Sequence, residues 1–213
     1  MPRAIALPWL PLLAACSSAY YSTMETFGLQ KRDILVDRIE DGRDSQQEAK
    51  TEFQGALAAF KAATGFKGTD LEALHDKLVA RLEDCESSAA DVRDRIESIE
   101  EVADDLFAEW KDEVRQYTSS DLRAQSEKLL RDTKERYGSL LSAMKRAEAA
   151  MEPVLDAFHD QVLFLKHNLN AQAIASLAGN VAAIEDDVAR LVADMEASIA
   201  EADAFIESMG ATG

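Results

Sequence analysis

The fold is decided by the stretch LEALHDKLVARLEDCESSAADVRDRIESIEEVADDLFAEWKDEVRQY, which spans residues 71–117. Apolar or small residues recur there at every seventh position in two registers, which together form one continuous seam. The first register holds Leu71, Leu78, Cys85, Val92, Ile99 and Leu106, and the second holds His75, Leu82, Ala89, Ile96, Ala103, Trp110 and Tyr117. A seven-residue repeat held over this length predicts a long helix that packs in the manner of a coiled coil.

Breaks in the periodicity divide the rest of the chain into further helices. They fall at residues 64–68, 118–121 and 167–170, which read TGFKG, TSSD and HNLN. After the first break, Thr69 and Glu72 have the spacing of a capping box, and Asn170 is the expected N-cap after the last. Upstream, Ser22 and Glu25 form another capping box, which predicts that a helix begins near residue 22.

The three flanking segments carry their own apolar stripes at steps of three and four residues. The first stripe holds Met24, Phe27, Leu35, Ile39, Ala49, Phe53, Ala56, Phe60 and Ala63. The third segment's stripe holds Leu122, Leu129, Tyr137, Leu141, Met144, Met151, Leu155, Phe158, Val162 and Leu165, and Pro153 is expected to kink that helix. The last stripe holds Ile174, Leu177, Val181, Ile184, Val188, Leu191, Met195, Ala202, Phe205 and Met209.

These patterns predict an all-α protein. Short connections force neighbouring helices to run antiparallel. A long helix whose apolar stripe is exposed to water is not stable alone, so the helices must pack together. The simplest arrangement is an elongated up-down four-helix bundle, on the order of 60–70 Å long at 1.5 Å per residue. A bundle of three long helices, in which the last break is only a bend, is the alternative.

The N-terminus has the pattern of an export signal. Residues 1–15 combine a basic start with an apolar stretch too short to span a bilayer, and they end directly before Cys16. The sequence LAAC at residues 13–16 resembles the lipobox of bacterial lipoproteins, which predicts a lipid on Cys16 and a mature chain of residues 16–213. Ser17, rather than Asp, follows the cysteine, and by the same resemblance this favours the outer membrane. The alternatives are a soluble export signal and a buried apolar tail.

The charge excludes one class of partner and indicates another. A formal net charge of −17 and a pI near 4.5 argue against nucleic-acid binding. The excess lies on residues 70–117, which carry −10, and on residues 169–213, which carry −7. We expect these two helices to be diagonal in the bundle, with acidic ridges that either bind a basic partner or simply keep the protein soluble. The ridge residues are Glu97, Glu100, Glu101, Asp104, Asp105, Glu185, Asp186 and Asp187.

Di-iron sites in four-helix bundles are built from Glu-x-x-His motifs. Glu72 and His75 match this motif, and Asp156 and His159 match it with aspartate in place of glutamate. Folding the chain at the second break puts His75 opposite residue 163, about one turn from His159. The other helices offer no carboxylate at that level, so we expect no metal and no cofactor.

Other chemistry has no support in the sequence. There is no nucleophile elbow, phosphate loop or zinc-type cysteine cluster. Cys85 lies in the seam, where it fits a small buried hydrophobe better than an intermolecular disulfide. The sequence therefore predicts a protein that is not an enzyme.

Two segments resemble a known bacterial family. Residues 20–38, YYSTMETFGLQKRDILVDR, and residues 165–174, LKHNLNAQAI, are similar to a helical family known as domain of unknown function 2959. The resemblance implies a Gram-negative envelope protein and implies no activity. Together with the lipobox it leads to the expectation of a periplasmic lipoprotein with a structural or interaction role, whose partner is an envelope protein and whose oligomeric state is open. A metal-binding oxidoreductase and a ligand-sensing bundle are the alternatives.

Overall fold

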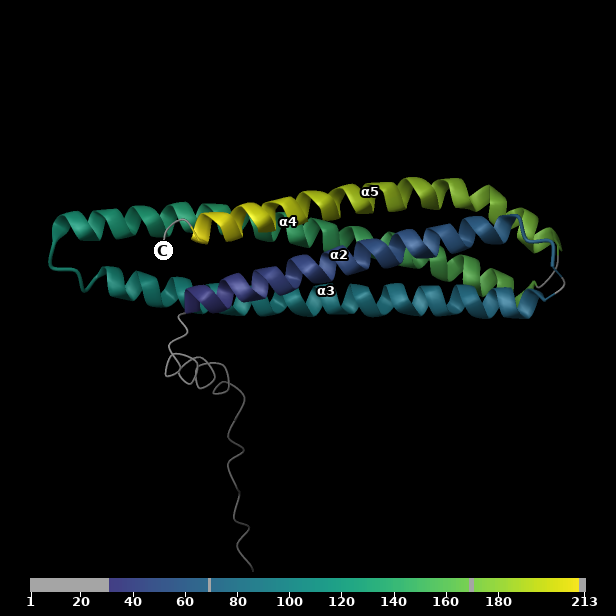
Figure 1. Cartoon of the computed structure of the whole chain (residues 1–213), viewed down its shortest axis with the longest axis horizontal. Coiled ribbons are helices and arrows are strands. Elements are labelled where there is room, and N and C mark those ends of the chain that lie inside the picture. The colour runs from purple at the N-terminus through teal and green to yellow at the C-terminus, as the bar shows by residue number, and fades with distance from the viewer. Residues whose placement is uncertain (1–30, 69, 169–170, 211–213) are drawn as a thin grey trace, which may run out of the picture.

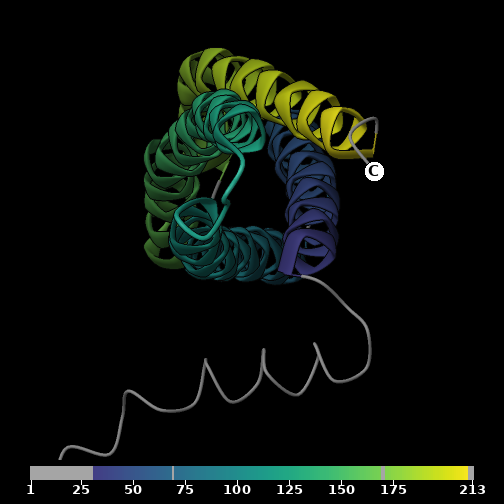
Figure 2. The same cartoon turned by 90° about the vertical axis from the view of Figure 1, so that its left-hand side faces the viewer.

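The protein is a bundle of four long helices in its computed structural model, which describes residues 31–68, 70–168 and 171–210. In chain order the helices are α2 (Lys31–Thr64), α3 (Leu71–Val114), α4 (Ser120–His167) and α5 (Ala171–Gly210). They lie side by side along one axis (Figure 1), and seen end-on they form a closed square (Figure 2). The four-helix prediction is therefore confirmed, and the three-helix alternative is wrong.

The order of the helices around the square follows the chain. α2 packs against α3 and α5, and α4 packs against the same two helices from the opposite corner. The two acidic helices, α3 and α5, are therefore diagonal, as the chain order of an up-down bundle predicts. This placement separates like charges by the less acidic α2 and α4.

One apolar core fills the bundle along its length. Most positions of the four predicted stripes are buried, including Leu78, Cys85 and Ile99 of the heptad seam, which are 0% exposed. The ring of Phe158 from α4 stacks on Phe60 of α2, with 4.8 Å between centroids. Contacts of this kind across the core add to the area buried on folding.

The helix ends agree with the predicted breaks, with one correction. The N-cap of α3 is Asp70, whose carboxylate accepts a hydrogen bond from the backbone N–H of Ala73 at 3.0 Å, so the predicted capping box at Thr69 is wrong. Ser119 caps α4 in the same way. The predicted caps at Ser22 and Asn170 lie outside the described residues. Pro153 lies inside α4, which is continuous through it.

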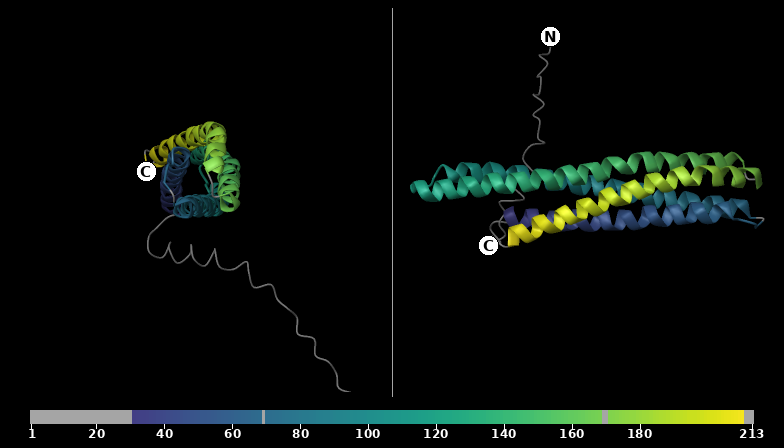
Figure 3. Two further views of the ribbon diagram at one scale, coloured as in Figure 1. Left: turned by 90° about the vertical axis from the view of Figure 1, so that its right-hand side faces the viewer. Right: turned by 90° about the horizontal axis from the view of Figure 1, so that it is seen from above.

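The helices differ in length, and this shapes one end of the molecule. α3 and α4 continue past the first residue of α2 and the last residue of α5, so their hairpin projects beyond the square (Figures 1 and 3). At its tip, Trp110 donates a hydrogen bond from Nε1 to Oγ of Ser126 at 2.9 Å. The hairpin is therefore held together by its own contacts where only two described helices remain.

Candidate functional surfaces

The predicted lipidation site, Cys16, lies outside the described residues, together with residues 1–15. The charge segregation, the candidate metal ligands and the exposed apolar groups all lie on the bundle and can be placed. None of the four described helices is both long enough and apolar enough to cross a membrane.

The candidate metal ligands do not come together. His75 is largely buried, with Nδ1 3.6 Å from Oδ1 of Asp76, whereas Glu72, Asp156 and His159 are exposed. In the described part of the chain, no group of three or more His, Cys, Asp or Glu side chains could hold a metal ion.

The two histidines also differ in exposure. His75 is largely buried in the seam of α3, whereas His159 is exposed on α4. Ion pairs join the same two helices farther along the hairpin, where Glu100 pairs with Lys145 at 2.6 Å and Arg93 pairs with Glu148 at 3.2 Å.

The predicted acidic ridges are exposed for the most part, but they are neutralised to different extents. Glu185 pairs with Lys61 at 2.6 Å, Glu100 pairs with Lys145, and Asp187 pairs with Arg190. The remaining ridge carboxylates have no Lys or Arg nitrogen within 4.0 Å in the described part of the chain. These are Glu97, Glu101, Asp104, Asp105 and Asp186. The unneutralised charge is therefore concentrated on α3.

The two ridges also lie at different levels. Arg95 pairs with Asp41 at 3.5 Å and Lys31 pairs with Glu109 at 2.9 Å, which places residues 97–105 of α3 beside the beginning of α2. Glu185 is level with Lys61 at the other end of α2. The two acidic groups are thus about 30 Å apart along the axis at 1.5 Å per residue, a separation that the sequence pattern does not reveal.

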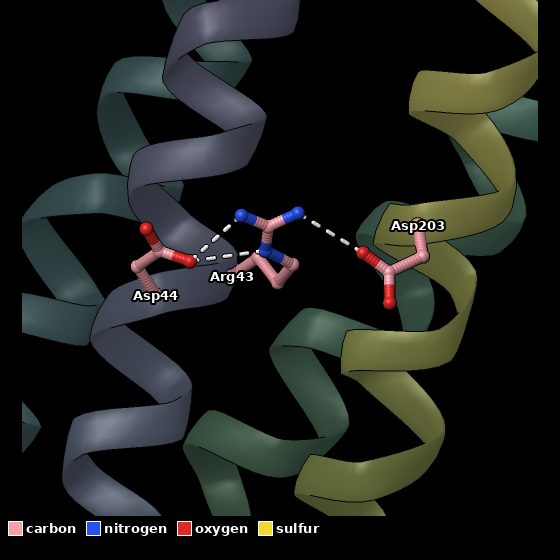
Figure 4. Close-up of polar contacts among 3 residues, drawn as sticks. All are labelled: Arg43, Asp44 and Asp203. Carbon is pink, nitrogen blue, oxygen red and sulfur yellow. Dashed lines mark hydrogen bonds and ion pairs between the residues drawn. The ribbon is translucent and has the colours of Figure 1, made fainter.

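Ion pairs join α2 to α5 at one constant register. Figure 4 shows Arg43, whose Nη1 donates to Oδ1 of Asp203 at 3.1 Å while Nε and Nη2 donate to Oδ1 of Asp44. These hydrogen bonds, with Asp44 first and Asp203 second, raise the pKa of Arg43. Lys50 continues the row toward Glu196 at 3.6 Å. Bases of α2 therefore offset acids of α5, and α3 has fewer such partners.

Cys85 is fully buried in the seam, as its register predicts. Burial, followed by the nearby carboxylate of Glu52, raises the pKa of its thiol to about 12. The thiol is therefore protonated at neutral pH and is shielded from other molecules, which does not suit it to form a disulfide between chains.

Three residues predicted to lie in a seam are exposed instead. Tyr117, Leu122 and Leu129 are 40%, 52% and 44% exposed, and all three belong to the tip of the α3–α4 hairpin. Their apolar character follows the bundle pattern, but α2 and α5 do not reach this far within the described residues. At the opposite end, Leu163 and Phe164 are also exposed, and no periodic signal marks them.

Two buried polar side chains were missed by the sequence pattern. Gln46 of α2 is 1% exposed and Ser198 of α5 is 0% exposed. Neither the amide of Gln46 nor the hydroxyl of Ser198 has a hydrogen-bond partner among the described residues. The gap between Met195 and Ala202 in the predicted stripe of α5 was the only available signal for Ser198.

One family of known proteins matches the chain. The model of a family described as "Protein of unknown function (DUF2959)" matches residues 20–209, almost the whole chain. No curated protein and no solved structure matches the chain. The resemblance seen in residues 20–38 and 165–174 is therefore confirmed, and the chain belongs to this family of unknown function.

Proposed function

We propose that the protein is a lipid-anchored lipoprotein of the Gram-negative outer membrane, whose helical bundle is a structural or protein-interaction body in the periplasm and has no catalytic activity. The observation that carries the proposal is the sequence LAAC at residues 13–16, placed directly after a short apolar run with a basic start. This arrangement is what signal processing and acylation of a cysteine require. Two acyl chains on Cys16 would supply stable membrane affinity.

The bundle supports an interaction role. Its four described helices bury one continuous core, and the excess negative charge is segregated on α3 and α5. Residues 97–105 of α3 present carboxylates that nearby bases leave largely unneutralised, which suits a basic partner surface. Charge of this kind speeds association and selects partners more than it adds affinity.

Acylation is tested by metabolic labelling with a radioactive or clickable fatty acid in cells that produce the full chain. We expect label in the wild type and in Cys85→Ala, and none in Cys16→Ala. Cys85→Ala is the matched control because it removes the other cysteine of the chain. Label that persists in Cys16→Ala, or a wild-type protein found entirely in the soluble periplasmic fraction, would contradict the proposal.

The choice of membrane is tested separately by density-gradient fractionation. We expect the wild type to sediment with the outer membrane and Ser17→Asp to move to the inner membrane. A matched Ser18→Asp variant should remain with the outer membrane. If the wild type itself sediments with the inner membrane, the outer-membrane assignment is wrong while the acylation proposal stands.

The interaction role is tested by crosslinking in intact cells. We expect a variant that combines Glu97→Gln, Glu101→Gln and Asp104→Asn to form less of the crosslinked adducts than the wild type does. A control variant with Glu127→Gln, Glu135→Gln and Asp160→Asn removes the same charge from exposed positions of α4. Equal loss in both variants would mean that bulk charge, and not the α3 surface, drives association.

A further inference from the structure

The side of α4 that faces α5 has an uncovered apolar stripe near the beginning of the helix. Leu122 and Leu129 are one heptad apart in α4, and they are 52% and 44% exposed. They lie on the hairpin that projects beyond the last residue of α5 (Figure 3). Two large apolar side chains on one side of a helix indicate a surface that packs against something else.

The same stripe of α4 is covered by α5 farther along the bundle. Ala143 and Ala150 are two and three heptads after Leu129; Ala143 is 2% exposed, and Ala150 packs against the core. Nε of Arg146, four residues before Ala150 and hence on the same side of the helix, lies 3.3 Å from Oδ1 of Asp194 on α5. The two leucines therefore extend a surface that packs against a helix elsewhere in the same molecule.

The hairpin tip, residues 110–132, differs in charge from the rest of the chain. It holds five bases and five acids, so its formal net charge is 0, whereas the whole chain carries −17. The bases are Lys111, Arg115, Arg123, Lys128 and Arg131, and the acids are Asp112, Glu113, Asp121, Glu127 and Asp132. Two copies of the chain repel each other over most of their surface, but not at the tip. A contact between two tips also directs the acidic bundles away from each other.

The charges beside the two leucines are complementary under a twofold axis. Asp121 directly precedes Leu122, and Lys128 directly precedes Leu129. When two α4 helices pack antiparallel with Leu122 against Leu129 of the second copy, Asp121 lies beside Lys128 of that copy, and the axis makes both contacts twice. Lys128 pairs with Asp132 of its own helix at 2.6 Å, yet its side chain is 71% exposed and remains accessible to the second copy.

We propose that two copies of the protein form a twofold dimer through the first turns of α4, in which Leu122 of each copy packs against Leu129 of the other. A helix overlap of about 12 residues is about 18 Å long and about 10 Å wide, so the contact is smaller than a standard interface. The dimer is therefore weak and reversible. The pairing does not depend on acylation of Cys16. A lipid surface and another part of the same chain are the other occupants that the tests distinguish.

The first test is sedimentation velocity of the full chain as cells produce it, purified in a mild detergent. We expect the wild type to convert from monomer to dimer as its concentration rises through the micromolar range. Leu122→Gln with Leu129→Gln should raise the dissociation constant about tenfold or more, because each dimer loses four apolar contacts. Leu163→Gln with Phe164→Gln removes two side chains of similar exposure, 45% and 42%, at the other end of α4 and should dimerise like the wild type.

Three results would overturn the proposal. The first is a wild type that stays monomeric at every concentration. The second is equal weakening by the two pairs of substitutions, which places the contact elsewhere. The third is a dimer that Leu122→Gln with Leu129→Gln leaves intact, while the same variant loses binding to vesicles of phosphatidylethanolamine and phosphatidylglycerol. That result identifies a lipid surface as the occupant.

Cysteine crosslinking in cells tests the same contact without detergent. Gln125 lies between the two leucines on the same side of α4, near the twofold axis. In a Cys85→Ala background, Gln125→Cys should form a disulfide-linked dimer on mild oxidation, identified by non-reducing electrophoresis and peptide mapping. Ala124→Cys, exposed on another side of the same turn, should not, and neither should the background alone.

Equal dimer yields from Gln125→Cys and Ala124→Cys would contradict the predicted side of α4. If Gln125→Cys gives no dimer and also reacts more slowly with an alkylating reagent than Ala124→Cys, another part of the same chain covers the stripe and the dimer is wrong.

Discussion

The least expected residues of the core are the polar side chains of Gln46 and Ser198. Gln46 lies between Arg43 and Lys50 on α2, and the ion-pair partners of those bases, Asp203 and Glu196, flank Ser198 on α5. The two unpartnered side chains are therefore at one level of the bundle. Burying a polar group without a hydrogen bond costs free energy, so this layer lowers stability.

Ser198→Ala should raise the free energy of unfolding by about 1 kcal/mol, because it removes a buried hydroxyl that has no partner. Gln46→Met should act in the same direction while preserving volume. Urea denaturation measures both changes. Ser139→Ala, on the exposed face of α4, is the control and should stay within about 0.5 kcal/mol of the wild type. A loss of stability in Ser198→Ala would mean that the hydroxyl is satisfied in solution.

Cys85 makes stability depend on pH above the ordinary range of a thiol. Its pKa is raised to about 12 from 9.0, so the unfolded chain releases this proton first. The stabilising contribution is complete below pH 9 and is lost as the pH rises toward 12. Between pH 7 and pH 10 we expect the wild type to lose about 1 kcal/mol of stability relative to Cys85→Ala. Urea denaturation of both proteins at the two pH values tests this, and a difference that does not change with pH would contradict it.

The sequence predicted the burial of these three residues unequally, for a physical reason. Cys85 occupies a position of the heptad repeat and counts as apolar, so its burial follows from periodicity alone. Ser198 and Gln46 also occupy seam positions, but their polarity removes them from an apolar pattern. Only the packing of the residues around them, which lie on the same stripe, brings them inside.

At the level of helices, glycines show where packing competes with helix propensity. A Cβ at Gly138 of α4 would meet nothing within 4 Å, whereas one at Gly42 of α2 would lie 2.8 Å from Cδ1 of Ile99. Ile99 is 0% exposed, so its side chain has little room to move aside. Alanine has a higher helix propensity than glycine, which favours the substitution at both positions. Only at Gly138 does the added Cβ meet no other side chain.

Gly138→Ala should raise the free energy of unfolding by about 0.5–1 kcal/mol. Gly42→Ala should gain less or lose stability, since Ile99 must adopt another conformation. Thermal or urea unfolding of the two variants checks the difference between them. Equal gains would show that the core around Ile99 is loose at this level.

Helix number and most helix ends were predictable, because caps and breaks are local signals. The breaks at residues 64–68 and 118–121 fall where the sequence placed them. The sequence placed the cap at Thr69, one residue before Asp70, because Thr69 and Glu72 have the spacing of a capping box and Asp is an equally good capping residue. The exposure of Leu122 and Leu129 was not predictable, because it depends on where two other helices end.

At the scale of the whole molecule, repulsion between like charges is the main electrostatic effect that destabilises the fold. The chain carries −17, and α3 and α5 hold almost all of the excess. Exposed ion pairs between helices, such as Lys61 with Glu185, are each worth little. Repulsion among the carboxylates should therefore outweigh these pairs at low ionic strength.

We expect the melting temperature to rise by a few degrees when NaCl increases from 10 to 300 mM, because salt shortens the Debye length to below about 10 Å. A variant that combines Glu97→Gln, Glu101→Gln and Asp104→Asn should melt at a higher temperature in 10 mM NaCl. Its melting temperature should also change less when salt is added. Calorimetry or circular dichroism measures both effects. A melting temperature that falls with salt would mean that attraction across the helix interfaces dominates.

The diagonal placement of the acidic helices was predictable from chain order, but the levels of the ridges were not. Short connections permit only one cyclic order in an up-down bundle, so α3 and α5 had to be diagonal. The axial register depends on the lengths of all four helices and on the packing between them. This is why Glu97 and Glu185 were predicted as parts of one pattern although they lie at different levels of the bundle.

The unbroken core has a mechanical consequence. A helix of this bundle cannot slide along its neighbours by one or two residues, because charged side chains would then replace Leu78 or Ile99 in the seam. The length of the bundle can therefore change only by whole heptads, each about 10 Å long. Each heptad must be inserted or deleted at matched positions of all four helices. The distance between the two ends of the bundle is therefore set by the number of heptads in its helices.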